Sequence, residues 1–72
     1  MLNLTERGKN IKIELLRRDL SQRWLRDRLE DRHILTDPSQ LSSILRGALK
    51  SPKAEVVIAV SEEILGVKNN AE

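Results

Sequence analysis

The apolar residues of the chain recur every three or four positions in four stretches, which is the spacing of helices buried on one side. The run 56–60 alone would suit a strand, but apolar residues on both sides of it keep the helical spacing. The predicted helices are one capped by Thr5, one from Gln22 to about Arg32, one from Pro38 to the stop at Gly47, and one from Pro52 to Leu65. We expect an all-helical domain of four or five helices, with a core of Leu15, Leu25, Leu29, Leu41, Ile44, Ile58 and Leu65.

Capping residues mark the helix starts in the middle of the chain. Ser21 can accept a hydrogen bond from the free N–H groups in the first turn of the second helix. Asp37 is the equivalent cap of the third helix, and Pro38 stands at the first helical position, where its missing N–H costs nothing. Gln40 can reach back to close a capping box. Gly47 can adopt the left-handed conformation that ends a helix, so the third helix is short.

The first helix carries a core stripe that contains a glycine. Leu4, Gly8, Ile11 and Leu15 follow the helical spacing, and we expect Leu16 to join the same broad face. A glycine inside a helix costs about 1 kcal/mol relative to alanine. Its presence in the stripe predicts that another helix approaches closely at this point.

A long connection, residues 30–37, separates the second helix from the third. It is either an extra turn of the second helix or an ordered loop held by Ile34 and Leu35. Trp24, the only aromatic residue, is open to two interpretations. Its ring either packs under this connection or anchors a partner protein, because tryptophan dominates binding hot spots. We expect partial exposure in the free chain, since Trp24 is rotated by about 100° from the inward-facing Leu25.

The composition excludes several kinds of chemistry. The 72-residue chain has no cysteine and a single histidine, so it cannot build a disulfide framework or a thiolate metal site. No nucleophile with a base and no phosphate-binding glycine loop occurs at workable spacing. Glu62 and Glu63 are adjacent, and we expect both to be solvated on an exposed helical face. We therefore expect no enzyme activity, no metal ion, no cofactor and no small-molecule substrate.

The hydropathy of the chain bears on its location. The longest unbroken apolar run, 56–60, is far too short for a membrane span, and the N-terminus lacks the apolar segment of a signal peptide. We expect a cytoplasmic protein that does not contact membranes.

The net charge of +2 conceals an asymmetry along the chain. Residues 1–53 carry 12 Lys/Arg against 7 Asp/Glu, whereas residues 54–72 carry 1 against 4. The basic part contains the predicted second and third helices. This distribution favours a phosphate-facing surface with an acidic far side, although a solvated face of mixed charge has a similar composition.

Two short helices, of which the second has small polar residues on its outer side, form the pattern of a helix-turn-helix. The residues that carry the pattern, Ser21-Gln22, Leu25, Leu29 and Leu41-Ser42-x-Ile44-Leu45-x-Gly47, resemble the Cro/CI class of phage and bacterial regulators, the XRE family. The upstream Leu4-Thr5-x-x-Gly8-Lys9-x-Ile11-Lys12 and the downstream Ser51-Pro52-Lys53 extend the resemblance over nearly the whole chain. The chain departs from the family pattern at Arg26, where a small residue is usual, and in the length of the connection 30–37.

The resemblance implies a lambda-repressor-like domain over residues 1–66 and regulation of transcription by binding operator DNA in a bacterium or a phage-infected cell. The low apolar content at the end of the sequence predicts a flexible tail over 67–72. It further implies that Gln22 braces the third helix and bonds a phosphate, that Pro38, Ser39, Ser42 and Ser43 face base edges, and that Arg46, Lys50 and Lys53 clamp the DNA backbone. Serines contact any base edge but discriminate poorly, and Gln40 is the only side chain there that suits a bidentate contact to adenine. We expect low specificity from this helix alone.

A second interpretation makes the chain a protein-binding module. Some small phage proteins that the chain resembles bind a CI-type repressor protein and modulate or oppose its action. This interpretation assigns the protein interface to Arg23, Trp24 and Arg28. A domain of this size is also near the limit at which burial just offsets conformational entropy, so a homodimer or a partner protein would add stability.

Overall fold

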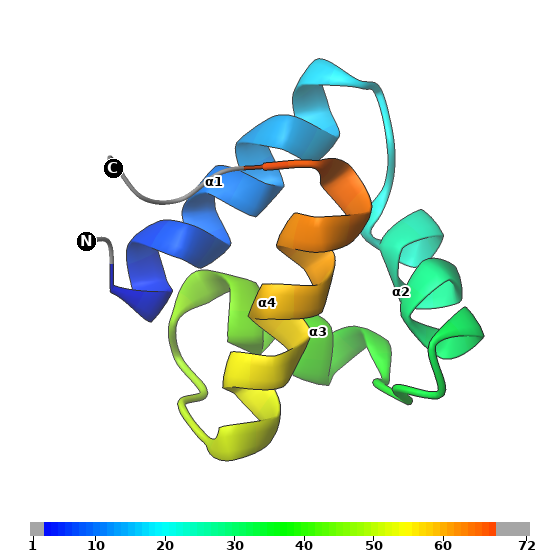
Figure 1. Ribbon diagram of the computed structural model, residues 1–72. Helices are drawn as coiled ribbons and strands as arrows, with labels where there is room; N and C mark the ends of the chain where they lie inside the picture. The colour runs from blue at the N-terminus through cyan, green and yellow to red at the C-terminus, as the bar shows by residue number, and fades with distance from the viewer. Residues whose placement is uncertain (1–2, 68–72) are drawn as a thin grey trace.

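The structure, a computed structural model, describes residues 3–67 and contains four α-helices and no strand within that range. The helices are α1 (Leu4–Arg17), α2 (Gln22–Asp31), α3 (Pro38–Arg46) and α4 (Pro52–Leu65). Figure 1 shows α4 crossing the middle of the molecule in front, with α1 at the upper left, α2 at the right and α3 behind the lower part of α4. α3 and α4 contact each other, and each of them also contacts both α1 and α2. The prediction of an all-helical fold is confirmed, with four helices in the part described.

One hydrophobic core joins all four helices. Its buried members are Ile11, Leu15, Leu25, Leu29, Leu41, Ile44, Leu45, Ala54, Val57, Ile58 and Leu65. All seven residues predicted for the core are among them. Leu25, Leu29 and Leu41 have no exposed surface, so α2 and α3 are held through side chains at the centre of the core.

The start of α1 differs from the prediction, which placed the cap at Thr5. Asn3 is the N-cap, and its side-chain oxygen accepts a hydrogen bond of 2.8 Å from the Glu6 backbone N–H. Glu6 Oε1 in turn accepts from the Asn3 backbone N–H at 3.4 Å, which completes a capping box. α1 therefore begins at Leu4, and Thr5 lies inside the helix.

Leu16 also differs from the prediction. The side chain that we expected in the core stripe is 79% exposed, whereas its neighbour Leu15 is 3% exposed. Successive residues of a helix point about 100° apart, so Leu16 lies on a side of α1 that residues 3–67 leave largely open to solvent. The core face of α1 is narrower than the apolar sequence indicated.

Gly8 marks the close approach of α1 to α3, as predicted. A Cβ atom built on Gly8 would lie 2.5 Å from the backbone oxygen of Leu45. That separation is far shorter than a van der Waals contact, and the obstacle is backbone rather than a flexible side chain. The absence of a side chain at Gly8 therefore sets the distance between α1 and α3.

The predicted caps of α2 and α3 are confirmed, and α4 has a serine cap of the same kind. Ser21 accepts from Trp24 N–H at 3.0 Å, Asp37 from Gln40 N–H at 2.6 Å, and Ser51 from Ala54 N–H at 3.1 Å. At the other ends, Gly47 and Gly66 adopt left-handed conformations with φ of 81° and 70°. Gln40 was predicted to reach back and close a capping box at the start of α3. Its side chain makes another contact instead, because Oε1 accepts from Lys53 Nζ at 3.3 Å.

The connection between α2 and α3 is an ordered loop and not an extension of α2. After the helix ends at Asp31, His33 takes a left-handed φ of 63°, and the Ile34 N–H donates back to the Leu29 carbonyl at 3.0 Å. This hydrogen bond belongs to a Schellman motif, which turns the chain sharply out of the helix. Ile34 packs against the core as predicted, but Leu35 is 65% exposed and does not hold the loop.

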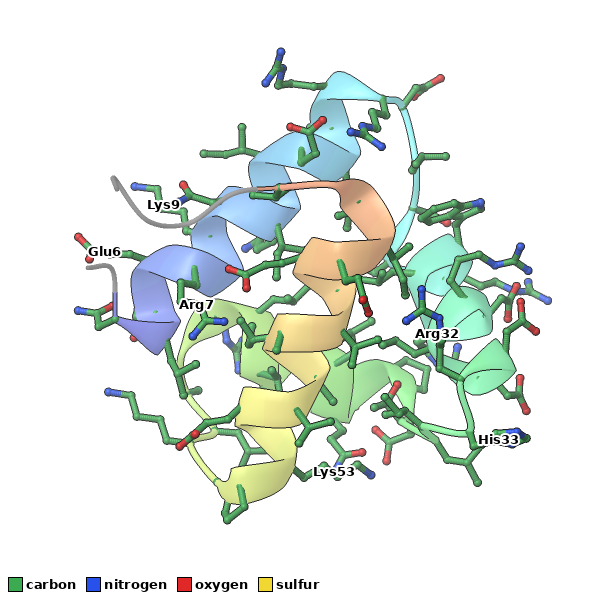
Figure 2. All side chains as sticks on the ribbon, viewed as in Figure 1. Glu6, Arg7, Lys9, Arg32, His33 and Lys53 are labelled. Carbon is green, nitrogen blue, oxygen red and sulfur yellow. The ribbon has the colours of Figure 1, made fainter. Side chains whose placement is uncertain are left out.

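Two side chains tie this loop to the helices beside it. Arg26 Nε donates to the Thr36 carbonyl at 3.1 Å, and Lys53 Nζ donates to the Leu35 carbonyl at 2.6 Å. Figure 2 shows Lys53 near the start of α4, and His33 at the outer side of the loop. The loop is therefore held from α2 on one side and from α4 on the other.

Polar contacts also join α1 to α4. Arg7 donates to both carboxylate oxygens of Glu62, at 3.0 and 2.6 Å. Glu62 is 7% exposed, so our expectation that it is solvated was wrong. The hydrogen bonds to Glu62 raise the pKa of Arg7 above its ordinary value, against the opposing effect of burial. The guanidinium of Arg7 stays protonated throughout the neutral pH range.

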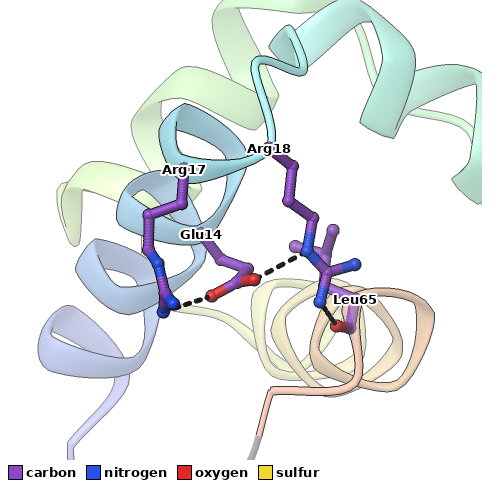
Figure 3. A network of polar contacts seen from close by, with 4 residues as sticks. All are labelled: Glu14, Arg17, Arg18 and Leu65. Carbon is purple, nitrogen blue, oxygen red and sulfur yellow. Dashed lines mark hydrogen bonds and ion pairs between the residues drawn. The ribbon is translucent and has the colours of Figure 1, made fainter.

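A second set of contacts holds the C-terminal ends of α1 and α4 together (Figure 3). Arg18 donates to Glu14 Oε2 at 2.6 Å and to the backbone oxygen of Leu65 at 2.6 Å. Arg17 donates to the other oxygen of Glu14 at 3.3 Å. The carbonyl of Leu65 lies at the end of α4, where intrahelical donors are missing, so Arg18 satisfies a group that the helix leaves free.

The C-terminal tail was predicted to begin at residue 67. Val67 does not belong to it, because this residue packs partly buried against the core and its N–H donates to the Glu62 carbonyl at 2.9 Å. The remainder of the predicted tail, 68–72, lies outside the described residues. Within residues 3–67, no helix is both long enough and apolar enough to cross a membrane.

Candidate functional site

A continuous surface on α2 and α3 contains most of the residues predicted to bind DNA. A cleft between the helices is lined by Gln22, Arg23, Arg26, Asp27 and Pro38. A second hollow, over the outer side of α3, is lined by Pro38, Ser39, Ser42, Ser43 and Arg46. Pro38 belongs to both, so the two hollows adjoin. We call these nine residues the α2–α3 surface.

The outer side of α3 follows from the pattern of its core residues. Leu41, Ile44 and Leu45 point into the core, which leaves the serines and Arg46 on the opposite side. Pro38, Ser39 and Arg46 are exposed, whereas Ser42 and Ser43 are half-buried. The short side chains leave the helix backbone close to the surface. Such a face allows another molecule to approach the helix closely.

Three of the predicted DNA-binding residues lie outside the α2–α3 surface. Gln40 and Lys53 are paired with each other, and Lys53 is also bonded to the Leu35 carbonyl. Lys50 is exposed in the segment between α3 and α4 and makes no hydrogen bond or ion pair within the described part of the chain. Lys50 is thus available for binding, while Gln40 and Lys53 already have partners in the fold.

The charge of the α2–α3 surface is only weakly positive. Three guanidinium groups, on Arg23, Arg26 and Arg46, stand against the carboxylate of Asp27. A second carboxylate, that of Asp37, caps the start of α3 and accepts from the Gln40 N–H. The cap places a negative charge at the positive end of the α3 dipole. Electrostatic attraction for phosphate therefore comes from the arginines and not from the N-terminus of α3.

The three residues predicted as a protein interface are divided between two sides of α2. Arg23 lines the cleft, whereas Trp24 is half-buried against the core, and the guanidinium of Arg28 lies 5.8 Å from the centre of its ring. On a helix, Trp24 and the cleft residue Arg26 point about 200° apart. The expected partial exposure of Trp24 is confirmed. Trp24 and Arg28 form a surface separate from the α2–α3 surface.

The side of α2 with Trp24 faces the end of α4. Arg32 Nη1 lies 2.7 Å from Glu63 Oε1, which bridges the two helices. Figure 2 shows the Arg32 side chain in the space between α2 and α4. A partner that covers Trp24 and Arg28 would therefore sit beside α4, away from Pro38 and the serines of α3.

Arg26 is a cleft residue that our sequence analysis did not assign to a site. Its position on α2 indicated only an outward-facing side chain. The structure shows that its Nε holds the Thr36 carbonyl while the side chain lines the cleft. The sequence contains one signal of this role, because an arginine in place of a small residue accompanies a connection that is longer than usual.

Comparison of the chain with protein-family models, with curated proteins and with solved structures found no match. Among residues 3–67, no group of three or more histidine, aspartate or glutamate side chains is placed to hold a metal ion. The case for a function therefore depends on the surfaces described above.

Proposed function

We propose that the chain is a small transcriptional regulator of the lambda-repressor-like helix-turn-helix class, which binds operator DNA through the α2–α3 surface. The observation that carries the proposal is the capped helix α3, whose outer side presents Pro38, three serines and Arg46 next to the arginine-containing cleft of α2. A helix with such a face fits the major groove, where short side chains allow close approach to base edges.

The composition of this surface indicates how the binding energy is divided. Serine hydroxyls donate and accept, so they discriminate weakly between bases. Gln40, which could read adenine, has its side-chain oxygen bonded to Lys53. Contacts to phosphate, from Arg46 and Lys50 above all, then supply most of the affinity. We expect binding that is strongly salt-dependent and only modestly selective for sequence.

Replacing Arg46 with alanine tests this division. We expect weaker binding to operator and to random DNA alike, and a salt dependence that is flatter by about one released ion, because a phosphate contact is lost. Fluorescence anisotropy of labelled duplexes over a series of salt concentrations measures both quantities. Arg17→Ala is the matched control, since Arg17 is exposed on α1 and its ion pair within residues 3–67 is with Glu14. A loss confined to one operator base pair would show that Arg46 reads a base instead.

The wild-type chain itself tests the proposed function. Electrophoretic shifts with DNA from the region upstream of its own gene should show a complex that forms without any other protein. The same experiment with a CI-type repressor protein, added in steps, shows whether the two proteins compete for the DNA or bind it together. No shift at low salt in the absence of the repressor would contradict the proposal.

A second candidate function, binding to a CI-type repressor protein, is favoured by one observation. Trp24, the only aromatic residue, remains half-exposed, with the guanidinium of Arg28 near its ring. Tryptophan and arginine are the residues most often found at the centres of protein interfaces. Because this surface is separate from the α2–α3 surface, the chain can bind a repressor protein and DNA at the same time.

Trp24→Ala distinguishes an anchor from a residue that only supports the fold. If Trp24 anchors a repressor, the affinity should fall by about 2 kcal/mol or more while the folded fraction is maintained. Tryptophan fluorescence of the wild-type protein should also shift to the blue when the repressor is added. A blue, quencher-protected signal in the isolated chain, together with lower stability and unchanged repressor affinity for Trp24→Ala, would assign the ring to the fold alone.

A further inference from the structure

We propose that the cleft between α2 and α3 binds one phosphate group of the DNA backbone through the guanidinium groups of Arg23 and Arg26. The proposal rests on the proposed DNA binding and adds two arginines, Arg23 and Arg26, to the phosphate contact that the resemblance implies for Gln22. Four residues from two successive turns of α2 line one wall of the cleft, and Pro38 closes the other side. It adjoins the outer side of α3 at Pro38, so a helix of DNA docked on α3 would bring its backbone to the cleft.

Arg26 is held in position by the loop that it supports. Its Nε donates to the Thr36 carbonyl at 3.1 Å, and the side chain is half-buried. A guanidinium has five N–H donors in a rigid fork, so one bond to a carbonyl leaves the two terminal nitrogens able to donate. Because the side chain is already ordered, binding a phosphate costs little additional side-chain entropy.

Arg23 supplies the second guanidinium. It lies three residues before Arg26, and side chains with this spacing are neighbours on a helix surface. Arg23 is exposed and makes no hydrogen bond or ion pair within the described residues. The N–H donors of a guanidinium match the geometry of phosphate oxygens. The free guanidinium of Arg23 and the fixed guanidinium of Arg26 lie on one wall and together form a suitable binding site for a phosphodiester. The amide of Gln22, which lines the same cleft, offers a further donor.

Asp27 opposes this binding from inside the cleft. Its carboxylate lines the same wall, is exposed, and has no hydrogen bond or ion pair within residues 3–67. A carboxylate beside a phosphate is a like-charge contact, which lowers the affinity. Neutralising Asp27 removes this repulsion and breaks no bond of the fold. Asp27→Asn is therefore expected to bind DNA more tightly than the wild-type chain, which a damaged fold could not produce.

The test measures binding of a labelled random-sequence duplex by anisotropy over a series of NaCl concentrations. We expect Arg23→Gln and Arg26→Gln each to flatten the salt dependence by about one ion. Asp27→Asn should raise the affinity by about threefold or more, on the order of a single screened charge contact. Arg28→Gln is the matched control, because it removes the same charge from the opposite side of α2 and should leave the slope close to that of wild type. Arg26→Gln also loses the bond to Thr36, so its melting is measured alongside.

The outcomes separate the cleft from the proposed function. Suppose that the wild-type chain binds DNA, that Arg23→Gln and Arg28→Gln have equal effects, and that Asp27→Asn brings no gain in affinity. This result would overturn the phosphate site in the cleft and leave the proposed DNA binding intact. No binding by the wild-type chain at any salt concentration would overturn both. Addition of inorganic phosphate at constant ionic strength distinguishes a backbone phosphate of DNA from free phosphate as the ligand. If the cleft binds the DNA backbone, inorganic phosphate should not compete specifically with the duplex. Strong competition would assign the cleft to free phosphate instead.

Discussion

Leu29→Ala is expected to lower the free energy of unfolding by about 2–5 kcal/mol, enough to unfold much of a domain of this size at room temperature. Leu29 has no exposed surface and lies in the core shared by all four helices. Its backbone oxygen also accepts the Ile34 N–H that turns the chain out of α2. Loss of the side chain leaves a cavity at the point from which α2 and α3 are positioned. Chemical denaturation followed by circular dichroism measures the effect.

Leu16→Ala is the matched control for Leu29→Ala. The same atoms are removed, but the side chain of Leu16 is 79% exposed, so the free energy of unfolding should change by no more than about 0.5 kcal/mol. Equal effects of the two substitutions would contradict the arrangement of the core. A fully folded Leu29→Ala protein with unchanged melting would contradict the placement of α2.

Substitutions at Gly8 set helix propensity against packing. Alanine favours a helix by about 1 kcal/mol over glycine, so propensity alone predicts that Gly8→Ala stabilises the protein. A Cβ at this position would lie 2.5 Å from the Leu45 backbone oxygen, and α1 would have to move away from α3. We expect the free energy of unfolding to fall by about 1–2 kcal/mol for Gly8→Ala and by about 3 kcal/mol for Gly8→Val, because overpacking costs more than the gain in helix propensity. Thermal and urea denaturation measure both values.

Ala59→Gly supplies the propensity scale for this comparison. Ala59 is exposed in the middle of α4, so its replacement changes helix propensity without altering the core, and it should cost about 1 kcal/mol. If Gly8→Ala stabilised the protein by the same amount, α1 and α3 could not lie as close as the structure places them.

The sequence predicted the helices and the core because both depend on local patterns. Ser21, Asp37 and Ser51 are caps that act within their own first turns, and the apolar spacing selects the inward face of each helix. The start of α1 was misplaced because Asn3 and Thr5 are both good caps, and only the reciprocal bond between Asn3 and Glu6 decides between them.

The errors at Leu16 and Glu62 have a common cause. Whether a side chain is buried depends on which other helix lies opposite, and that information is absent from the pattern of one helix. Glu62 is buried because Arg7, 55 positions away in the chain, meets it across the contact between α1 and α4. Leu16 is exposed because, within residues 3–67, its side of α1 is left largely open to solvent.

The candidate site shows the same division between local and tertiary information. The outward serines of α3 follow from the inward positions of Leu41 and Ile44, so the sequence places them correctly. The pairing of Gln40 with Lys53 and the cleft role of Arg26 depend on how α4 and the loop meet α2 and α3. Those contacts could not be predicted from spacing. They engage the side chains of Gln40 and Lys53 within the fold, and they led us to propose Arg23 and Arg26 as further DNA contacts.

The proposed function depends on the binding of duplex DNA by the α2–α3 surface. The most direct measurement is a titration of the isotope-labelled chain with duplex DNA, followed by the chemical shifts of its backbone amides. We expect the largest changes at Gln22, Arg23, Ser39, Ser42, Ser43 and Arg46, with small changes along the exposed side of α4 around Ala59. Changes concentrated on Trp24, Arg28 or α4, or no changes at low salt, would contradict the proposed function.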